Sequence, residues 1–320
     1  MRALLLGLLL TLPGCAGGRE RLPPPPAAPV VSEPARLIPA DLDLVLRVDV
    51  TRVAAVLGLQ AERDLERLLQ RAPVEEPDFA TRRLLLSLLA RTRTLWIGVR
   101  PGLAPELTDN VLVLRGDFAG LLPTEVGGSP PWRGPHDLGG DWRRYERAAP
   151  TQRAAPAVLY VRSGDLAIFG SVAEMDALER TIEGGQPDSG VQVPDTGSVS
   201  LGARLPSLRS RLVETAPSVA KLMRGAESLQ ASVDLASGYF ELNAELRFDA
   251  PERAPAVAEA LRAVSLALEG PLGQWLQRAK IEAVERFVTL RLRAPEADVL
   301  RLLRCWSAEG CGTGDTVPAP

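Results

Sequence analysis

The sequence contains few histidines, few lysines and few aromatic residues. His136 is the only histidine, lysine occurs only as Lys221 and Lys280, and aromatic residues make up 4% of the chain. A single imidazole excludes multi-histidine metal sites, and sparse aromatics provide no stacking platform for single-stranded nucleic acid. The formal net charge of -3 comes from interleaved acidic and basic residues, so no basic face is expected. We therefore expect no metal, no cofactor and no nucleic-acid partner.

Three short motifs resemble functional signatures, and we interpret each of them as an ordinary surface position. Ser218-Val219-Ala220-Lys221 matches the Ser-x-x-Lys of serine β-lactamases, but no Lys-Thr-Gly accompanies it. Arg115-Gly116-Asp117 spells an adhesion tripeptide at a predicted strand end, not at a loop tip. His136 lies in the Gly- and Pro-rich stretch 127–140, which predicts a loop with a solvated histidine. We expect no catalytic residue.

The first residues have the pattern of a secretory signal peptide. Arg2 supplies one positive charge, the apolar run 3–12 follows, and Pro13-Gly14 ends that run. The run is too short for a membrane-spanning helix, which needs about 20 apolar residues. Leu12-Pro13-Gly14-Cys15 resembles the lipobox of bacterial lipoproteins.

This resemblance implies a signal peptide over residues 1–14, cleavage before Cys15 and lipid attachment to the Cys15 thiol. More than one acyl chain is expected, because a single chain binds a membrane only marginally. Ala16 in place of an aspartate resembles the outer-membrane sorting pattern of enteric bacteria. The membrane would thus be reached through lipidated Cys15, with the domain in the periplasm or at the surface.

Residues 15–36 are rich in proline, with Pro23 to Pro26 consecutive. Proline-rich chain favours an extended backbone and acts as a semi-rigid spacer, so we interpret this segment as a tether. A proline-motif ligand for a partner domain is the alternative.

Two further cysteines, Cys305 and Cys311, lie near the end of the chain. With Cys15 used for lipid attachment, an even number of cysteines is left. In an oxidising compartment this favours one disulfide between Cys305 and Cys311. The alternative is a pair of free thiols in the C-terminal tail 306–320.

Period-two alternation predicts half-buried antiparallel strands. The longest alternating stretches are 42–50, 228–235, 239–248 and 287–293, and shorter strands are expected at 95–99, 111–114, 157–162, 166–169, 198–203 and 281–285.

Helical spacing of apolar residues appears around 53–69, 84–88 and 252–268. Ser171 and Glu174 form a capping-box pattern that predicts a helix through about Ile182. The fold class is therefore α+β, as an antiparallel sheet with helices packed on one face.

The two halves of the folded part have a similar order of predicted elements. Residues 37–185 and 196–305 each start with a strand and end with a strand and a helix. The stretch 173–178 also matches 295–300, with acidic residues in the first helical turn. We interpret the halves as two α+β repeats that arose by internal duplication.

The predicted order resembles a group of duplicated α+β bacterial envelope proteins that have no established chemistry. The resemblance rests on Pro39-Ala40-Asp41 before the first strand and on Val48-Asp49 within it. It implies no site residues. The sequence thus favours a non-catalytic envelope lipoprotein that binds or scaffolds another envelope protein. The alternatives are a periplasmic carrier of an apolar ligand and a carboxylate-based hydrolase.

Overall fold

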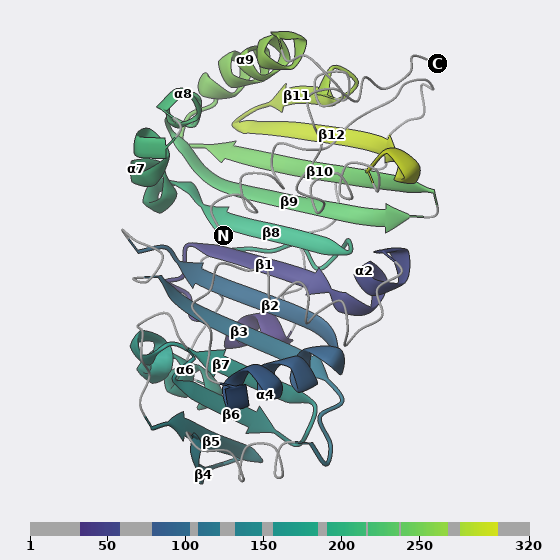
Figure 1. Cartoon of the computed structure of the whole chain (residues 1–320). Coiled ribbons are helices and arrows are strands. Elements are labelled where there is room, and N and C mark those ends of the chain that lie inside the picture. Colours follow the sequence, from purple (N-terminus) through teal and green to yellow (C-terminus); the bar gives the residue numbers. More distant parts are fainter. Residues whose placement is uncertain are drawn as a thin grey trace.

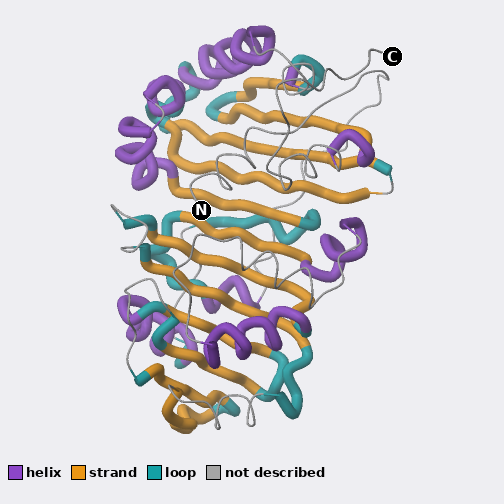
Figure 2. Tube along the Cα trace, in the orientation of Figure 1, coloured by secondary structure: helices purple, strands orange, loops and turns teal. Residues whose placement is uncertain are grey.

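One antiparallel sheet of 12 strands organises the described part of the chain (Figures 1 and 2). The computed structural model describes residues 33–57, 79–102, 108–121, 132–148, 156–184, 191–215, 217–236, 238–267 and 276–299. In sheet order the strands are β11 (Lys280–Val284), β12 (Phe287–Pro295), β10 (Tyr239–Phe248), β9 (Ala226–Ala236), β8 (Val199–Arg204), β1 (Leu44–Asp49), β2 (Thr92–Arg100), β3 (Asp109–Gly116), β7 (Leu166–Gly170), β6 (Val158–Arg162), β5 (Trp142–Arg147) and β4 (Trp132–Gly139).

The helices lie between these strands along the chain. They are η1 (Glu33–Leu37), α2 (Val50–Leu57), α4 (Phe79–Ala90), η3 (Val172–Glu174), α6 (Met175–Ile182), α7 (Leu205–Thr215), α8 (Pro217–Leu222) and α9 (Arg253–Ala267). None of these described helices combines the length and the apolar character that a membrane span requires.

The antiparallel sheet and most strand positions confirm the sequence-based prediction. β10 pairs with β9 on one side and with β12 on the other over its whole length. Its even-numbered residues, Phe240 to Phe248, face one side of the sheet, and its odd-numbered residues face the other. Alternation of apolar and polar residues predicts such a strand because each face meets a different environment.

β1 lies at the centre of the sheet and joins its two halves. It pairs with β2 on one side, where Arg47 lies opposite Trp96, and with β8 on the other, where Arg47 lies opposite Ser200. β2 to β7 thus extend the sheet in one direction and β8 to β12 in the other. The halves share a continuous hydrogen-bonded ladder.

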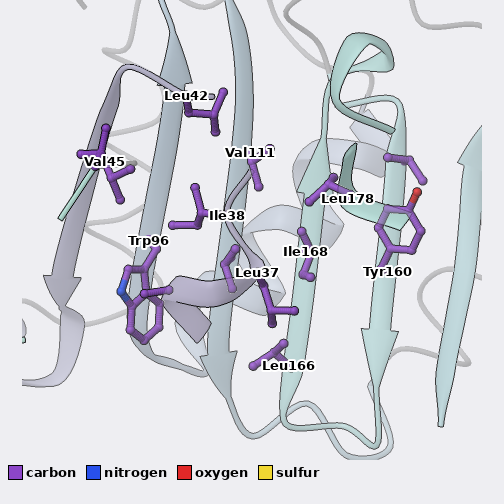
Figure 3. Packing of buried hydrophobic residues seen from close by; sticks show 14 of the residues in the cluster. Leu37, Ile38, Leu42, Val45, Trp96, Val111, Tyr160, Leu166, Ile168 and Leu178 are labelled. Carbon is purple, nitrogen blue, oxygen red and sulfur yellow. The ribbon is translucent and has the colours of Figure 1, made fainter. Parts of the chain in front are cut away.

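The prediction of helices on one face only is wrong for the first half. One face of β2, β3, β6 and β7 packs against η1 and α6, and Figure 3 shows Leu37 and Ile38 between Trp96 and Ile168. The opposite face packs against Leu84 and Leu88 of α4, which lies in front of the sheet in Figure 1. These strands are apolar on both sides, so both sides need a cover.

Two glycines allow the covering segments to approach the sheet closely. A Cβ at Gly98 would lie 2.5 Å from Leu42 Cδ1, and a Cβ at Gly170 would lie 2.5 Å from Leu178 Cδ1. Such distances are shorter than van der Waals contact. Packing at these points is therefore complete.

In the second half the described helices share one face. Apolar residues of α7, α8 and α9 pack with the even-numbered residues of β10 in one cluster, and Val53 and Val56 of α2 pack near Phe240. The other face is mainly polar, with the exposed Tyr239 and Val284 as apolar members. A single cross-strand row runs over it and continues into the apolar first half; it comprises Lys280, Arg291, Asn243, Ser232, Ser200, Arg47, Trp96, Val113, Ile168 and Tyr160.

Three local predictions differ from the structure. His136 lies in strand β4, not in a loop, because β4 pairs with β5 despite its glycines and proline. The Ser171 hydroxyl makes no capping hydrogen bond, and residues 172–174 form a short 3-10 turn before α6. Residues 33–36 belong to η1, and Ala35 is buried, so the folded part begins within the segment interpreted as a tether.

Both edges of the sheet carry features that disfavour further strand pairing. At the β11 edge, the guanidinium of Arg262 donates a 2.6 Å hydrogen bond to the carbonyl oxygen of Ile281. At the β4 edge, Pro135 lacks an N–H and the register with β5 shifts twice. Occupied acceptors, proline and bulges are common means of protecting a sheet edge.

Truncation of Leu178 tests the packing of α6 against the sheet. Leu178 is fully buried over Gly170, so Leu178→Ala should lower the free energy of unfolding by about 2–5 kcal/mol. Leu266→Ala is the matched control, because Leu266 on α9 is 72% exposed and should change stability by less than about 0.5 kcal/mol. Urea unfolding of both variants provides the comparison. Equal effects would contradict the packing described for α6.

Candidate functional site

A group of charged residues, two of them buried, surrounds Arg100, the last residue of β2. Its Nη1 atom lies 2.6 Å from Glu174 Oε1 and 3.6 Å from Asp109 Oδ2, and its Nη2 atom lies 2.5 Å from Asp41 Oδ2. Asp109 begins β3 directly opposite Arg100 in the strand register. Glu174 ends η3, and Asp41 precedes β1. We call these four residues the Arg100 cluster.

The cluster extends from the protein interior to its surface. The side chains of Glu174 and Asp109 are 1% and 2% exposed, whereas that of Asp41 is 67% exposed. Three carboxylates surround one guanidinium, so negative charge is in excess. Glu174 Oε2 is buried and has no hydrogen-bond partner, which is costly for a charged oxygen.

Burial raises the pKa of Glu174 above its ordinary value. Desolvation is the main cause, Arg100 acts against it, and the carboxylates of Asp41 and Asp109 add to it. A proton on Oε2 leaves Oε1 free to accept the hydrogen bond from Arg100. With Glu174 protonated, the hydrogen bond from Arg100 to Oε1 therefore still links β2 to η3.

The geometry does not favour a catalytic role for these acids. A carboxylate-based hydrolase needs two acids that face a substrate between them. Glu174 and Asp109 both contact the same guanidinium. Among the described residues no group of three histidine, cysteine, aspartate or glutamate side chains could hold a metal ion.

A second group of polar and charged side chains, centred on Glu179, links α6 to β5 and β6. Arg144 Nη1 donates a 2.5 Å hydrogen bond to Glu179 Oε1, and Tyr160 Oη donates to the same oxygen at 3.2 Å. Arg144 Nη2 also lies 2.7 Å from Glu146 Oε1. Burial, followed by the charge of Glu179, raises the pKa of Tyr160. The phenol therefore stays protonated and keeps donating its hydrogen bond.

The residues of the three sequence motifs lie on different elements of the fold. His136 is exposed on β4, Lys221 is exposed on α8, and Arg115-Gly116-Asp117 lies at the end of β3 as expected. Cys15, Cys305 and Cys311 lie outside the described residues.

The Arg100 cluster is not predictable from local sequence patterns because its members are far apart along the chain. Arg100 is 59 residues from Asp41 and 74 residues from Glu174. Glu174 was expected to form a capping box, yet its side chain reaches Arg100. One feature of the sequence could have indicated the position of Arg100. Residues two apart in a strand point to the same face, so Arg100 lies on the covered face of β2 together with Gly98.

Comparisons with known proteins show similarity in fold only. No family model matches the sequence, and no curated protein is similar to it. Solved structures of TP0453, a Treponema envelope protein, share the arrangement of elements. Crystal form III superposes with a TM-score of 0.50 at 12% identity, covering 85% of this chain and 98% of that chain. Crystal form I gives a TM-score of 0.48 at 12% identity, with coverage of 85% and 96%.

The Arg100 cluster predicts a specific pH dependence of stability. Because the folded state raises the pKa of Glu174, the folded chain retains a proton at pH values where the unfolded chain has released it. The stability from this proton is fully present below the ordinary glutamate pKa and is lost as pH rises through the raised value. Glu174→Gln removes this titration, so its stability relative to the native chain should improve as pH rises through that window.

Urea unfolding of both proteins over a pH series measures this difference. Glu183→Gln is the matched control, because Glu183 is exposed just after α6 and should leave the pH profile unchanged. Parallel profiles for Glu174→Gln and the native chain would contradict the buried proton site.

Proposed function

We propose that the chain is a lipid-anchored module of the bacterial envelope that binds or scaffolds another envelope component without catalysis. The observation that carries this proposal is Leu12-Pro13-Gly14-Cys15 directly after a short apolar run. The Pro-rich residues after Cys15 would act as a spacer between membrane and domain. The fold shared with TP0453, itself an envelope protein, supports the same location. Ala16 favours the outer membrane.

The state of the charged groups supports a non-catalytic role. The guanidinium of Arg100 and that of Arg144 each contact more than one carboxylate of the chain itself. These contacts link segments that are distant in sequence, namely η3 to β2 and α6 to β5. Such ion pairs position secondary structure.

We also infer that the folded part arose by duplication, with repeats over 37–185 and 196–305 followed by the tail 306–320. The strand orders support this inference. β1-β2-β3-β7-β6 in the first half corresponds to β8-β9-β10-β12-β11 in the second. The hairpin β4–β5 has no counterpart among the described strands of the second half, where α9 connects β10 to β11.

One observation favours a carrier of an apolar ligand as a second candidate function. Several apolar residues on the helix-bearing face of the central strands are only half-buried. They are Leu46, Val48, Leu95, Ile97, Val233, Leu242, Leu246 and Leu290. Apolar side chains that stay partly accessible beside helices could contact an acyl chain.

Replacement of Cys15 tests the anchor directly. Cys15→Ser removes the only thiol in the lipobox, so the variant should lose acyl mass and move from the membrane to the soluble fraction. The native chain should start at Cys15 and carry the added mass. Intact mass and membrane fractionation measure both properties. A native chain that is soluble, unacylated or still holds residues 1–14 would contradict the proposal.

Organic extracts of the two purified proteins distinguish the candidate functions. The extract of the native protein should contain lipid from its anchor whichever function is correct. An apolar molecule that co-purifies with Cys15→Ser as well would favour the carrier, whereas its absence favours the binding module.

We further propose that Cys305 and Cys311 form one disulfide in the exported chain. The five residues between them include Gly310 and can bring the two sulfurs together. Alkylation of the unreduced native protein should therefore modify neither cysteine, and alkylation after reduction should modify both. Mass spectrometry of the C-terminal peptide provides the readout. Full alkylation without reduction would show free thiols and exclude the disulfide.

A further inference from the structure

The polar face of the second half carries two adjacent stripes of opposite charge. On β12, Arg291 and Arg293 point to this face, and on β10, Glu241 and Glu245 point to it. Glu241 lies directly opposite Arg293 in the strand register, and Arg291 lies opposite Asn243. The stripes therefore run side by side along neighbouring strands, about 4.8 Å apart.

These charges are not neutralised within the described part of the chain. The side chains of Glu241, Glu245 and Arg291 make no ion pair or hydrogen bond there, and the guanidinium of Arg293 stacks over the Tyr239 ring at 4.2 Å instead of pairing with Glu241. Other charges on this face do pair: Asp234 of β9 with Arg52 at 3.0 Å, Lys280 of β11 with Glu282 at 2.8 Å, and Arg247 of β10 with Glu227 at 3.0 Å. The unpaired charges are thus confined to β10 and β12.

The described helices leave this face uncovered. α7, α8, α9 and α2 pack on the opposite, apolar face. The segment around Gln192 crosses the polar face only at the β8–β9 side, where its backbone lies over Gly202 and its side chain meets Gln230. The part of this face that no described segment covers comprises β10, β11, β12 and most of β9.

From these observations we propose that the polar face of β9 to β12 is the docking surface for a second copy of this chain. A two-fold axis parallel to the strands, between β10 and β12, places β12 of one copy over β10 of the other. Arg293 of each copy then meets Glu241 of the other, and Arg291 lies between Glu241 and Glu245 of the other copy. A closed dimer of this kind requires a self-complementary surface, and two adjacent stripes of opposite charge meet that requirement.

The size of the face is consistent with a specific but weak dimer. Four strands at about 4.8 Å spacing and up to about 33 Å in length present about 550 Å² per copy. The resulting total of about 1,100 Å² lies near the lower limit for specific interfaces. Because the contact is charged, the dimer should weaken as the salt concentration rises.

Charge reversal in the full chain tests the proposal. Glu241→Arg and Arg293→Glu should each weaken dimerisation by at least about tenfold, because each introduces two like-charge contacts across the axis. An equimolar mixture of the two variants should regain the native affinity, since in the mixed dimer both contacts pair opposite charges. Neither variant can regain it alone. If Glu241 and Arg293 acted only within their own chain, mixing the two variants would not restore dimerisation.

Sedimentation velocity of the detergent-solubilised full chain, over a range of protein concentrations, measures the dissociation constant. Glu259→Arg on α9 is the matched control, because Glu259 is exposed on the helix-bearing side and should leave dimerisation unchanged. A native chain that stays monomeric at every concentration, or a mixture no more dimeric than its separate components, would overturn the proposal.

Discussion

The pairing of β1 with β8 is the contact on which the arrangement of the rest depends. Residues 44–48 of β1 pair with 199–203 of β8, and the other edge of β1 pairs with β2. Each half alone would expose an open edge at its innermost strand, and such an edge invites pairing with other chains. The pairing of β1 with β8 closes both of these open edges. The outer edges, β4 and β11, are protected by proline, bulges and the Arg262 hydrogen bond.

Near this pairing, the residues on one face of the continuous sheet change from polar to apolar. Along the row through Arg47, residues on the β8 side are polar, whereas Trp96, Val113 and Ile168 on the β2 side are apolar. η1 and α6 cover the apolar side. The first half thus has an interior on both faces of its strands, and the second half has one interior face and one polar face.

Sequence patterns predict those features of the fold that depend on neighbouring residues. Alternation from Phe240 to Phe248 predicts β10 because a strand with one buried face repeats every two residues. β4 was missed because glycines and Pro135 weaken that pattern, yet pairing with β5 stabilises the strand. The spacing of Leu84 and Leu88 predicts a helix but cannot tell which face of the sheet it covers. That choice depends on the whole topology, as does the meeting of Arg100 with Asp41 and Glu174. The sequence supplies no partner chemistry for His136, Lys221 or Asp117, and the structure places these residues on β4, on α8 and just after β3.

Hydrogen exchange measured by mass spectrometry tests the continuity of the sheet most directly. Amides of β1 and β8 should be among the most protected, and peptides from β3 and from β10 should open with the same free energy, because one ladder connects them. A different result would be rapid exchange at β1 and β8, with the two halves opening at clearly different free energies. That result would show two independent sheets and contradict the central role of the β1–β8 pairing.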